Sequence, residues 1–111
     1  MSKPLERLLE YERHQVTSKR GGGVLAFEVW GLISGKNTQV TRYNLAYINH
    51  QMFQGDNGRV LGFDNAHGYH HRHFLGRVEA VDYISHEATL ARFREEWIEL
   101  IAHYRRMGSC E

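Results

Sequence analysis

The last quarter of the chain carries the clearest structural signal, a helical pattern over residues 86–106. Ser85 precedes this segment and is a favoured N-cap residue, because its hydroxyl can accept a backbone N–H of the first turn. Apolar side chains then recur at spacings of three and four: Leu90, Phe93, Trp97, Leu100, Ile101 and Tyr104. This spacing places them on one face of a helix. A helix with one apolar face must pack on another layer, so the rest of the chain has to supply that layer.

The segments in the first half of the chain have the composition of strands. Residues 24–33 are apolar, aromatic and β-branched, and Glu28 is their only charge. In residues 41–49 the larger apolar side chains alternate with smaller or polar ones, which is the period of a half-buried strand. The turn-forming sequence Ser-Gly-Lys-Asn lies between the two segments at 34–37. We therefore expect an antiparallel hairpin.

Further strands are expected around a polar turn in the middle of the chain. Residues 60–63 and 74–75 are apolar, and Gly68 is the expected turn residue between them. The Asn-Gly pair at 57–58 suits left-handed backbone angles and marks an earlier turn. Residues 76–84 are expected to continue as an extended segment with the apolar side chains directed inward.

The first residues predict a short helix over residues 3–14. Pro4 suits a first helical turn, and Leu5, Leu8 and Leu9 fall on one side of such a helix.

The order of these elements predicts an α+β fold in a single domain spanning residues 1–111. Residues 1–20 are expected to form the N-terminal helix and a linker. Residues 24–84 are expected to form an antiparallel sheet of four to five strands, and residues 85–106 the long C-terminal helix. Both helices are expected to pack on one face of the sheet, which leaves the other face free for a site or a partner.

The composition excludes several classes of protein. With 14 basic and 13 acidic residues, the formal net charge of +1 argues against a protein that binds nucleic acid through bulk charge. No apolar run approaches the roughly 20 residues of a membrane span, and the N-terminus lacks the apolar core of a signal peptide. The single cysteine, Cys110, allows no internal disulfide, which fits a reducing cytoplasm. We expect a soluble cytoplasmic protein that does not bind membranes.

Histidines are concentrated in the polar turn. Four of the eight histidines lie between residues 67 and 73, next to Arg72 and shortly after Asp64. Since side chains two apart on a strand share a face, His71 and His73 are expected to point one way and Arg72 the other. Neighbouring imidazoles disfavour double protonation, so one neutral and one charged ring can coexist near pH 7.

This pattern suits a metal-independent endoribonuclease that needs no cofactor. Such an enzyme requires a base for the 2′-hydroxyl, an acid for the leaving 5′ oxygen and a cation for the charged phosphorane. His71 and His73 are the candidate acid and base, with Arg72 or Arg42 as the cation. Asp64 is expected to orient an imidazole. The candidate substrate-binding residues are His67, His70, Arg42, Tyr69 and Asn65.

Three other interpretations stay open. His-x-His completed by Asp64, His67 or His70 is a pattern for a divalent-metal site. The histidines and nearby tyrosines also suit a non-catalytic stacking surface for single-stranded nucleic acid. Finally, Asp64 and Asn65 can make turn hydrogen bonds while the histidines are solvated loop residues.

Short motifs follow one another in a fixed order across residues 24–100. They are Phe27-Glu28-Val29-Trp30, Tyr43-Asn44-Leu45-Ala46-Tyr47, Phe63-Asp64-Asn65, Gly68, His71-Arg72-His73, a tyrosine before the final helix and Phe93 within it. This ordered set resembles the TumE family of bacterial toxin–antitoxin proteins. The resemblance implies the toxin half of a two-gene module whose other half is a helix-turn-helix antitoxin. RNA as the substrate is inferred from the histidines, and a homodimer is left open.

The chain departs from the family pattern at two places. Family members usually carry an arginine and a tyrosine before the Asp-Asn pair, where this chain has Gly62 and Phe63. They also carry a Gly-Lys-Gly-like turn, where this chain has residues 66–70. If that arginine and lysine hold phosphates in the family, the role passes here to the histidines of the turn or to Arg42.

Overall fold

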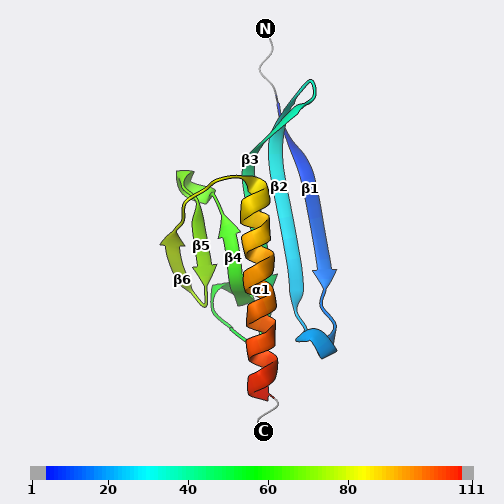
Figure 1. Cartoon of the computed structure of the whole chain (residues 1–111), viewed down its shortest axis with the longest axis vertical. Coiled ribbons are helices and arrows are strands. Elements are labelled where there is room, and N and C mark those ends of the chain that lie inside the picture. Colours follow the sequence, from blue (N-terminus) through cyan, green and yellow to red (C-terminus); the bar gives the residue numbers. More distant parts are fainter. Residues whose placement is uncertain (1–4, 109–111) are drawn as a thin grey trace.

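A six-stranded antiparallel sheet and one long helix form the architecture (Figure 1). The computed structural model describes residues 5–108. The strands lie in the sheet in chain order, so each strand pairs with the next one along the chain. In sequence the elements are β1 (Glu6–Gln15), η1 (Ser18–Arg20), β2 (Val24–Ser34), β3 (Asn37–Ile48), η2 (Asp56–Gly58), β4 (Arg59–Asp64), η3 (Ala66–Gly68), β5 (His71–Phe74), β6 (Arg77–Ala80) and α1 (His86–Gly108).

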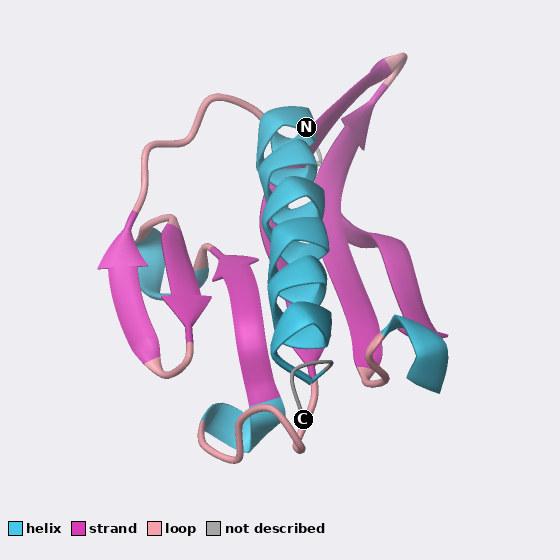
Figure 2. Ribbon diagram, turned by 60° about the horizontal axis from the view of Figure 1, so that its bottom comes forward, coloured by secondary structure: helices cyan, strands magenta, loops and turns pink. Residues whose placement is uncertain are grey.

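The helix α1 lies across one face of the sheet, and the described residues place no second layer on the other face (Figure 2). Phe93 of α1 is 1% exposed and packs edge-on against Phe27 of β2 and Phe63 of β4, with ring centroids 5.6 and 6.4 Å apart. Trp97 packs against Tyr47 of β3 at 5.9 Å. The predicted α+β class, with a long C-terminal helix on one face, is therefore confirmed.

The start of α1 follows the predicted cap. Ser85 Oγ accepts the backbone N–H of Ala88 at 3.0 Å, and the helix begins at the next residue after the cap. The helix is amphipathic, and within residues 5–108 no helix combines the length and apolarity needed to cross a membrane.

The predicted N-terminal helix is wrong, because Glu6–Gln15 form the edge strand β1. This strand pairs with β2 from Glu6 opposite Leu32 to Gln15 opposite Val24. A bulge between Leu8 and Glu10 shifts the register, so the apolar residues lose the alternation that marks a strand. The predicted start of the helix at residues 3–4 lies outside the described residues, as does Cys110.

The sheet also has more strands than the predicted four to five. Besides β1, the short strand β6 forms the opposite edge, and it covers Arg77–Ala80 rather than the whole extended segment predicted over 76–84. Val78 was expected to point inward but is 54% exposed. The reason is the register, because Val78 lies opposite His73 and so points to the face of the sheet that α1 does not cover.

The register of the central strands decides what the uncovered face carries. One row of directly opposed residues runs from Glu28 through Asn44 and Asp64 to His71. The neighbouring row runs through Ala46 and Gly62 to His73. Because opposed residues share a face, this register brings the polar residues of three strands together on the side away from α1. We call this side the open face.

Candidate functional site

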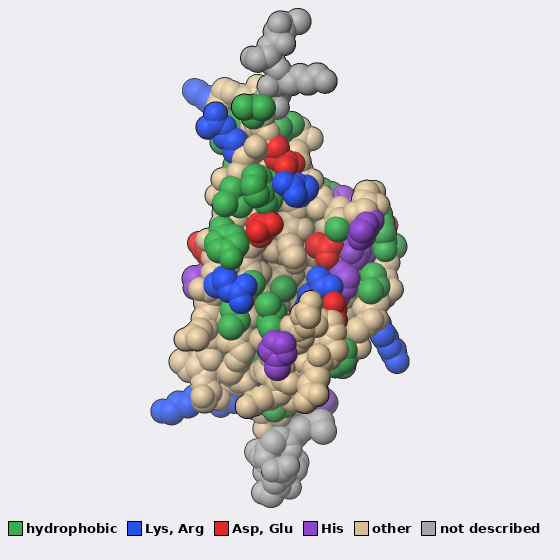
Figure 3. Space-filling view, turned by 180° about the vertical axis from the view of Figure 1, so that it is seen from behind, with side chains coloured by type: hydrophobic (Ala, Val, Ile, Leu, Met, Phe, Trp, Pro, Cys, Tyr) green, Lys and Arg blue, Asp and Glu red, His purple; other side chains and the backbone are tan. Residues whose placement is uncertain are grey.

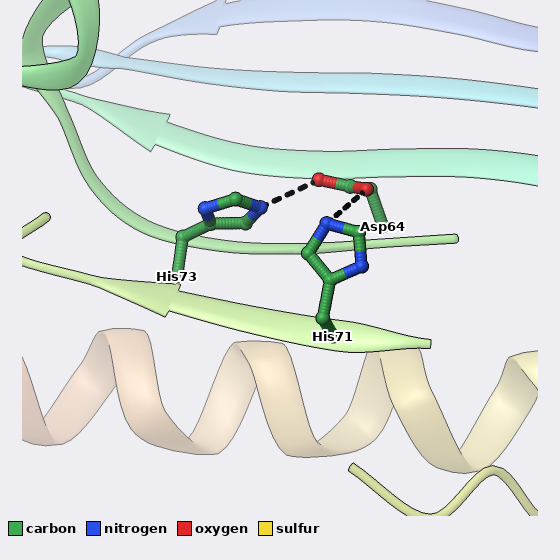
Figure 4. A group of neighbouring side chains, drawn as sticks. All are labelled: Asp64, His71 and His73. Carbon is green, nitrogen blue, oxygen red and sulfur yellow. Dashed lines mark hydrogen bonds and ion pairs between the residues drawn. The ribbon is translucent and has the colours of Figure 1, made fainter. Parts of the chain in front are cut away.

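The open face of β4 and β5 holds a buried carboxylate between two imidazoles. Asp64 is the last residue of β4, and the alternation of β5 directs His71 and His73 to the same side (Figure 4). His71 Nε2 lies 2.8 Å from Asp64 Oδ1, and His73 Nε2 lies 2.9 Å from Asp64 Oδ2. The side chains of His71, His73 and Asp64 are only 5%, 10% and 9% exposed. The predicted grouping of these three residues is thus present in the structure.

The carboxylate of Asp64 accepts from two further donors. The backbone N–H of Ala66 donates to Oδ1 at 3.0 Å, which holds the turn after β4. The Arg59 guanidinium approaches Oδ2 through Nη1 at 3.4 Å. The hydrogen bonds of both histidines, of Ala66 and of Arg59 thus converge on Asp64, which anchors the cluster electrostatically.

The protonation of His73 follows from its partners. Arg59 Nη2, which can only donate, lies 3.0 Å from His73 Nδ1, so this nitrogen must present its lone pair. The proton is then on Nε2 and is donated to Asp64. Burial, together with the charge of Arg59, lowers the pKa of His73 below its ordinary value of 6.5. His73 is therefore a neutral imidazole with one defined tautomer.

His71 has different partners. Its Nδ1 lies 3.1 Å from the carbonyl oxygen of Tyr69, which can only accept, so Nδ1 carries a proton. Its Nε2 faces a carboxylate oxygen of Asp64 at 2.8 Å. Two atoms at this distance share a hydrogen bond, so one proton lies between His71 Nε2 and Asp64 Oδ1. His71 and Asp64 are therefore joined through a proton, whereas His73 is a neutral ring that donates to the same carboxyl group.

Arg59 is the residue of this site that the sequence reasoning missed. It opens β4 and is held by Asp56, to which Nε and Nη2 donate at 2.8 and 3.1 Å. Its stem crosses Gly62, where a Cβ atom would come within 2.8 Å of Arg59 Cδ. The available signal was the arginine directly after the Asn-Gly turn together with a glycine inside a buried strand, which often marks close approach of another group.

A cavity of about 670 Å³ opens beside the cluster. Its walls include all three clustered residues, the aromatic side chains Trp30 and Tyr69, and both Arg42 and Arg59. Figure 3 shows histidine, acidic and basic side chains gathered on this face. Apart from histidines, the charged lining residues are two arginines and two carboxylates, Glu28 and Asp64. Their charges balance, so the net charge of the cavity lining depends on the protonation of the histidines.

Comparison of the chain with protein-family models, curated proteins and solved structures finds no match. The resemblance to the TumE family therefore remains a prediction from short motifs.

Arg72 does not lie at the cluster. As the alternation of β5 predicts, it points to the face that α1 covers, where Nε donates to Glu96 of α1 at 2.7 Å and Nη1 to Glu79 of β6 at 3.2 Å. Its guanidinium also lies over the ring of Phe74. The assignment of Arg72 as the cation beside the histidines is corrected for this reason, and Arg59 occupies that place.

His70 is also directed away from the cavity. It stacks on Tyr83 with ring centroids 4.0 Å apart, and its Nδ1 lies 2.8 Å from the hydroxyl of Tyr43. Burial raises the pKa of Tyr43 to about 12, so its hydroxyl stays protonated and shares a hydrogen bond with His70. His70 therefore fastens the segment before α1 to the sheet and is not placed to contact a substrate in the cavity.

The other predicted substrate-binding residues line the cavity. Tyr69 lies over His71 at 4.5 Å and His67 sits on the preceding turn. Arg42 also lines the cavity, where its guanidinium donates to Glu6 at 2.7 Å and lies over the ring of Trp30, 4.8 Å from the ring centroid. Asn65 is used structurally, because its amide accepts from the backbone of β3 through Oδ1 and donates to it through Nδ2.

Metal-binding potential is confined to the same cluster. Among the described residues, Asp64, His71 and His73 form the one group of three ligand-type side chains whose ligand atoms all lie within 4.8 Å of one another. His67 and His70, which the sequence offered as further ligands, are not part of this group.

Proposed function

We propose that the protein is an endoribonuclease that cleaves RNA in the open-face cavity and acts in the cytoplasm as the toxin of a bacterial toxin–antitoxin module. The observation that carries the proposal is the buried Asp64 carboxyl group held between the imidazoles of His71 and His73, beside a cavity of about 670 Å³. The cavity falls within the usual size of small-molecule sites, so it accommodates a nucleotide segment. A helix-turn-helix antitoxin is the expected partner, as the resemblance to the TumE family implies.

His73 is the proposed base. It is neutral, and its free electron pair is on Nδ1, where it faces the guanidinium of Arg59. A phosphate that binds Arg59 draws the guanidinium away from this nitrogen. The electron pair then becomes available to remove the proton of the 2′-hydroxyl, so substrate binding itself exposes the base.

His71 is the proposed acid. Its Nδ1 donates to Tyr69 O and its Nε2 shares a proton with Asp64, and this shared proton is the one proposed for transfer. Protonation of the leaving 5′ oxygen requires that one of these hydrogen bonds is exchanged for one to the substrate. Until that exchange occurs, Asp64 holds the proton and the ring in place through the 2.8 Å contact with Nε2. The two imidazoles thus begin the reaction in the protonation states that cleavage requires.

Binding of the RNA chain uses the other walls of the cavity. Trp30 and Tyr69 offer aromatic surfaces on which bases stack, with a typical contribution of about 1–3 kcal/mol per base. Arg42 and Arg59 each have a carboxylate partner, Glu6 and Asp56 respectively. A phosphate has to compete with these carboxylates, so binding is expected to be moderate and strongly dependent on salt.

The test is cleavage of end-labelled RNA by purified protein, with and without EDTA. Cleavage that persists in EDTA and leaves 2′,3′-cyclic phosphate ends is expected, and His71→Gln or His73→Gln should reduce its rate by about 10²–10⁴-fold. His103→Gln, an exposed histidine of α1, is the matched control and should cleave like the wild type.

Two results would contradict the proposal. The acid–base assignment fails if folded His71→Gln and His73→Gln proteins cleave as fast as the control. The enzyme itself is excluded if RNA binds at the open face but is never cut, a result that identifies a non-catalytic binding module. Growth arrest on expression, lost in the same two variants, tests the toxin role separately.

A further inference from the structure

We propose that Asp64, His71 and His73 also form a binding site for one divalent transition-metal ion of the Zn²⁺ type, and that this ion competes with the metal-free nuclease chemistry. Two imidazole nitrogens and one carboxylate oxygen are the ligands such ions prefer. All three ligand atoms lie within 4.8 Å of one another. In a tetrahedral zinc site neighbouring ligand atoms are about 3.3 Å apart, so only small side-chain adjustments are needed.

His71 is already arranged as a metal ligand. Histidines that bind metals through one ring nitrogen usually donate the other N–H to a carbonyl or carboxylate oxygen, which fixes the ring. His71 Nδ1 donates to Tyr69 O at 3.1 Å in this way. Its Nε2 is directed at Asp64 Oδ1, 2.8 Å away, so an ion between these two atoms takes the place of the proton.

His73 requires one rearrangement, and the structure supplies the group that makes it possible. Its Nδ1 now accepts from Arg59, which keeps the proton on Nε2. Metal binding through Nε2 moves that proton to Nδ1, where it repels the guanidinium and needs an acceptor. Asp56 Oδ2 lies 3.9 Å from Nδ1 and is that acceptor. The result is the carboxylate–histidine–metal arrangement common in zinc sites.

The metal and the nuclease reaction exclude each other because the ion changes which ring nitrogens carry protons. An ion held by Nε2 of both histidines displaces the acid proton of His71 and moves the proton of His73 to Nδ1, the nitrogen that serves as the base. This consequence rests on the proposed function, whereas the metal site itself does not. Zn²⁺ is therefore expected to inhibit RNA cleavage, and EDTA to restore it.

Binding is tested on protein first freed of metal with EDTA and then dialysed. Titration with ZnCl₂ should show one ion per chain by calorimetry and a higher unfolding temperature. His71→Gln should lose this binding, whereas His103→Gln should retain it. Asp56→Asn, which leaves all three ligands in place, should weaken Zn²⁺ binding by about 10–100-fold.

Arg59→Met provides the sharpest test, because it acts in opposite directions on the two activities. Loss of the guanidinium removes a competing cation and frees His73 Nδ1, so Zn²⁺ should bind more tightly by about tenfold. RNA cleavage should fall, since the phosphate loses its ligand. Circular dichroism of each variant confirms that it is folded before binding is measured.

The outcomes separate the two proposals. Zn²⁺ binding that is unchanged in His71→Gln, or weaker in Arg59→Met, overturns the metal site. Zn²⁺ that binds at the site but accelerates RNA cleavage overturns the competition. Zn²⁺ binding with the expected variant pattern, in a protein that cuts no RNA under any condition, supports the site while the nuclease proposal fails.

Discussion

Replacement of Asp64 by asparagine is expected to destabilise the fold strongly. The carboxylate lies among His71, His73 and Arg59 and its side chain is 9% exposed. An asparagine keeps one acceptor oxygen and directs an NH₂ group at a donor, so it leaves Arg59 without its buried anion and removes a partner of His71. Removal of one partner of a buried charge pair lowers the free energy of unfolding by about 3–5 kcal/mol. A loss of 3 kcal/mol alone lowers the unfolding temperature of a domain near this size by roughly 12–24 °C.

Urea unfolding at neutral pH, followed by circular dichroism, measures this loss as a shift of the midpoint with an unchanged slope. Asp56→Asn is the matched control, because Asp56 bonds the same Arg59 but its side chain is 31% exposed. That variant should lose under about 1 kcal/mol. The account of Asp64 as the electrostatic anchor is refuted if its asparagine variant is no less stable than the Asp56 variant.

Three further predictions concern the cluster and the layer behind it. Burial lowers the pKa of His73 below 6.5, so between the two pKa values the unfolded chain binds a proton at His73 that the folded chain does not. The contribution of His73 to the free energy of unfolding is therefore complete above pH 6.5 and declines as the pH falls through the folded pKa. His73→Gln should flatten this part of the curve of urea midpoint against pH, and a curve of unchanged shape would contradict the assignment. Gly62→Ala places a Cβ atom 2.8 Å from Arg59 Cδ, so it should cost about 1–3 kcal/mol in urea unfolding and slow RNA cleavage, whereas wild-type values for both would show that the stem moves freely. Phe93→Ala should cost about 3–5 kcal/mol, because the ring is 1% exposed, and a loss below 1 kcal/mol in the same assay would place the core elsewhere.

The sequence predicts correctly those elements whose structure is determined by residues close together in the chain. The helix and its Ser85 cap depend on spacings of three and four and on one hydroxyl, and both are confirmed. The β2–β3 hairpin follows from alternation and a turn. Strand β1 could not be predicted in the same way, because the bulge between Leu8 and Glu10 interrupts the alternation of apolar and polar residues. Leucines that looked like one face of a helix are instead divided between an exposed edge and the core.

The candidate site likewise contains residues that local sequence patterns predict and residues that depend on distant parts of the chain. His71 and His73 share a face because of the strand period alone, and Asp64 joins them because β4 pairs with β5 in a register set by a short turn. Arg72 lies on the other face by the same period, so its choice as a cation contradicted the pattern that grouped the histidines. Arg59 has only a weak local signal, the Asn-Gly turn before it and the glycine three residues later, because its place beside His73 depends on a register shift after Tyr47 and on the missing side chain of Gly62.

Arg59 also explains why one cluster can serve either a phosphate or a metal ion. In the resting protein its guanidinium donates a hydrogen bond to His73 Nδ1, which keeps the His73 proton on Nε2. A phosphate removes the guanidinium by attracting it, and the bare Nδ1 becomes a base. A metal ion at Nε2 removes it by forcing the proton onto Nδ1, and Asp56 becomes the partner there. The two ligands thus require the same displacement of Arg59 but leave His73 with opposite nitrogens protonated. For this reason loss of the guanidinium should weaken one activity and strengthen the other, which no purely structural role of Arg59 would produce.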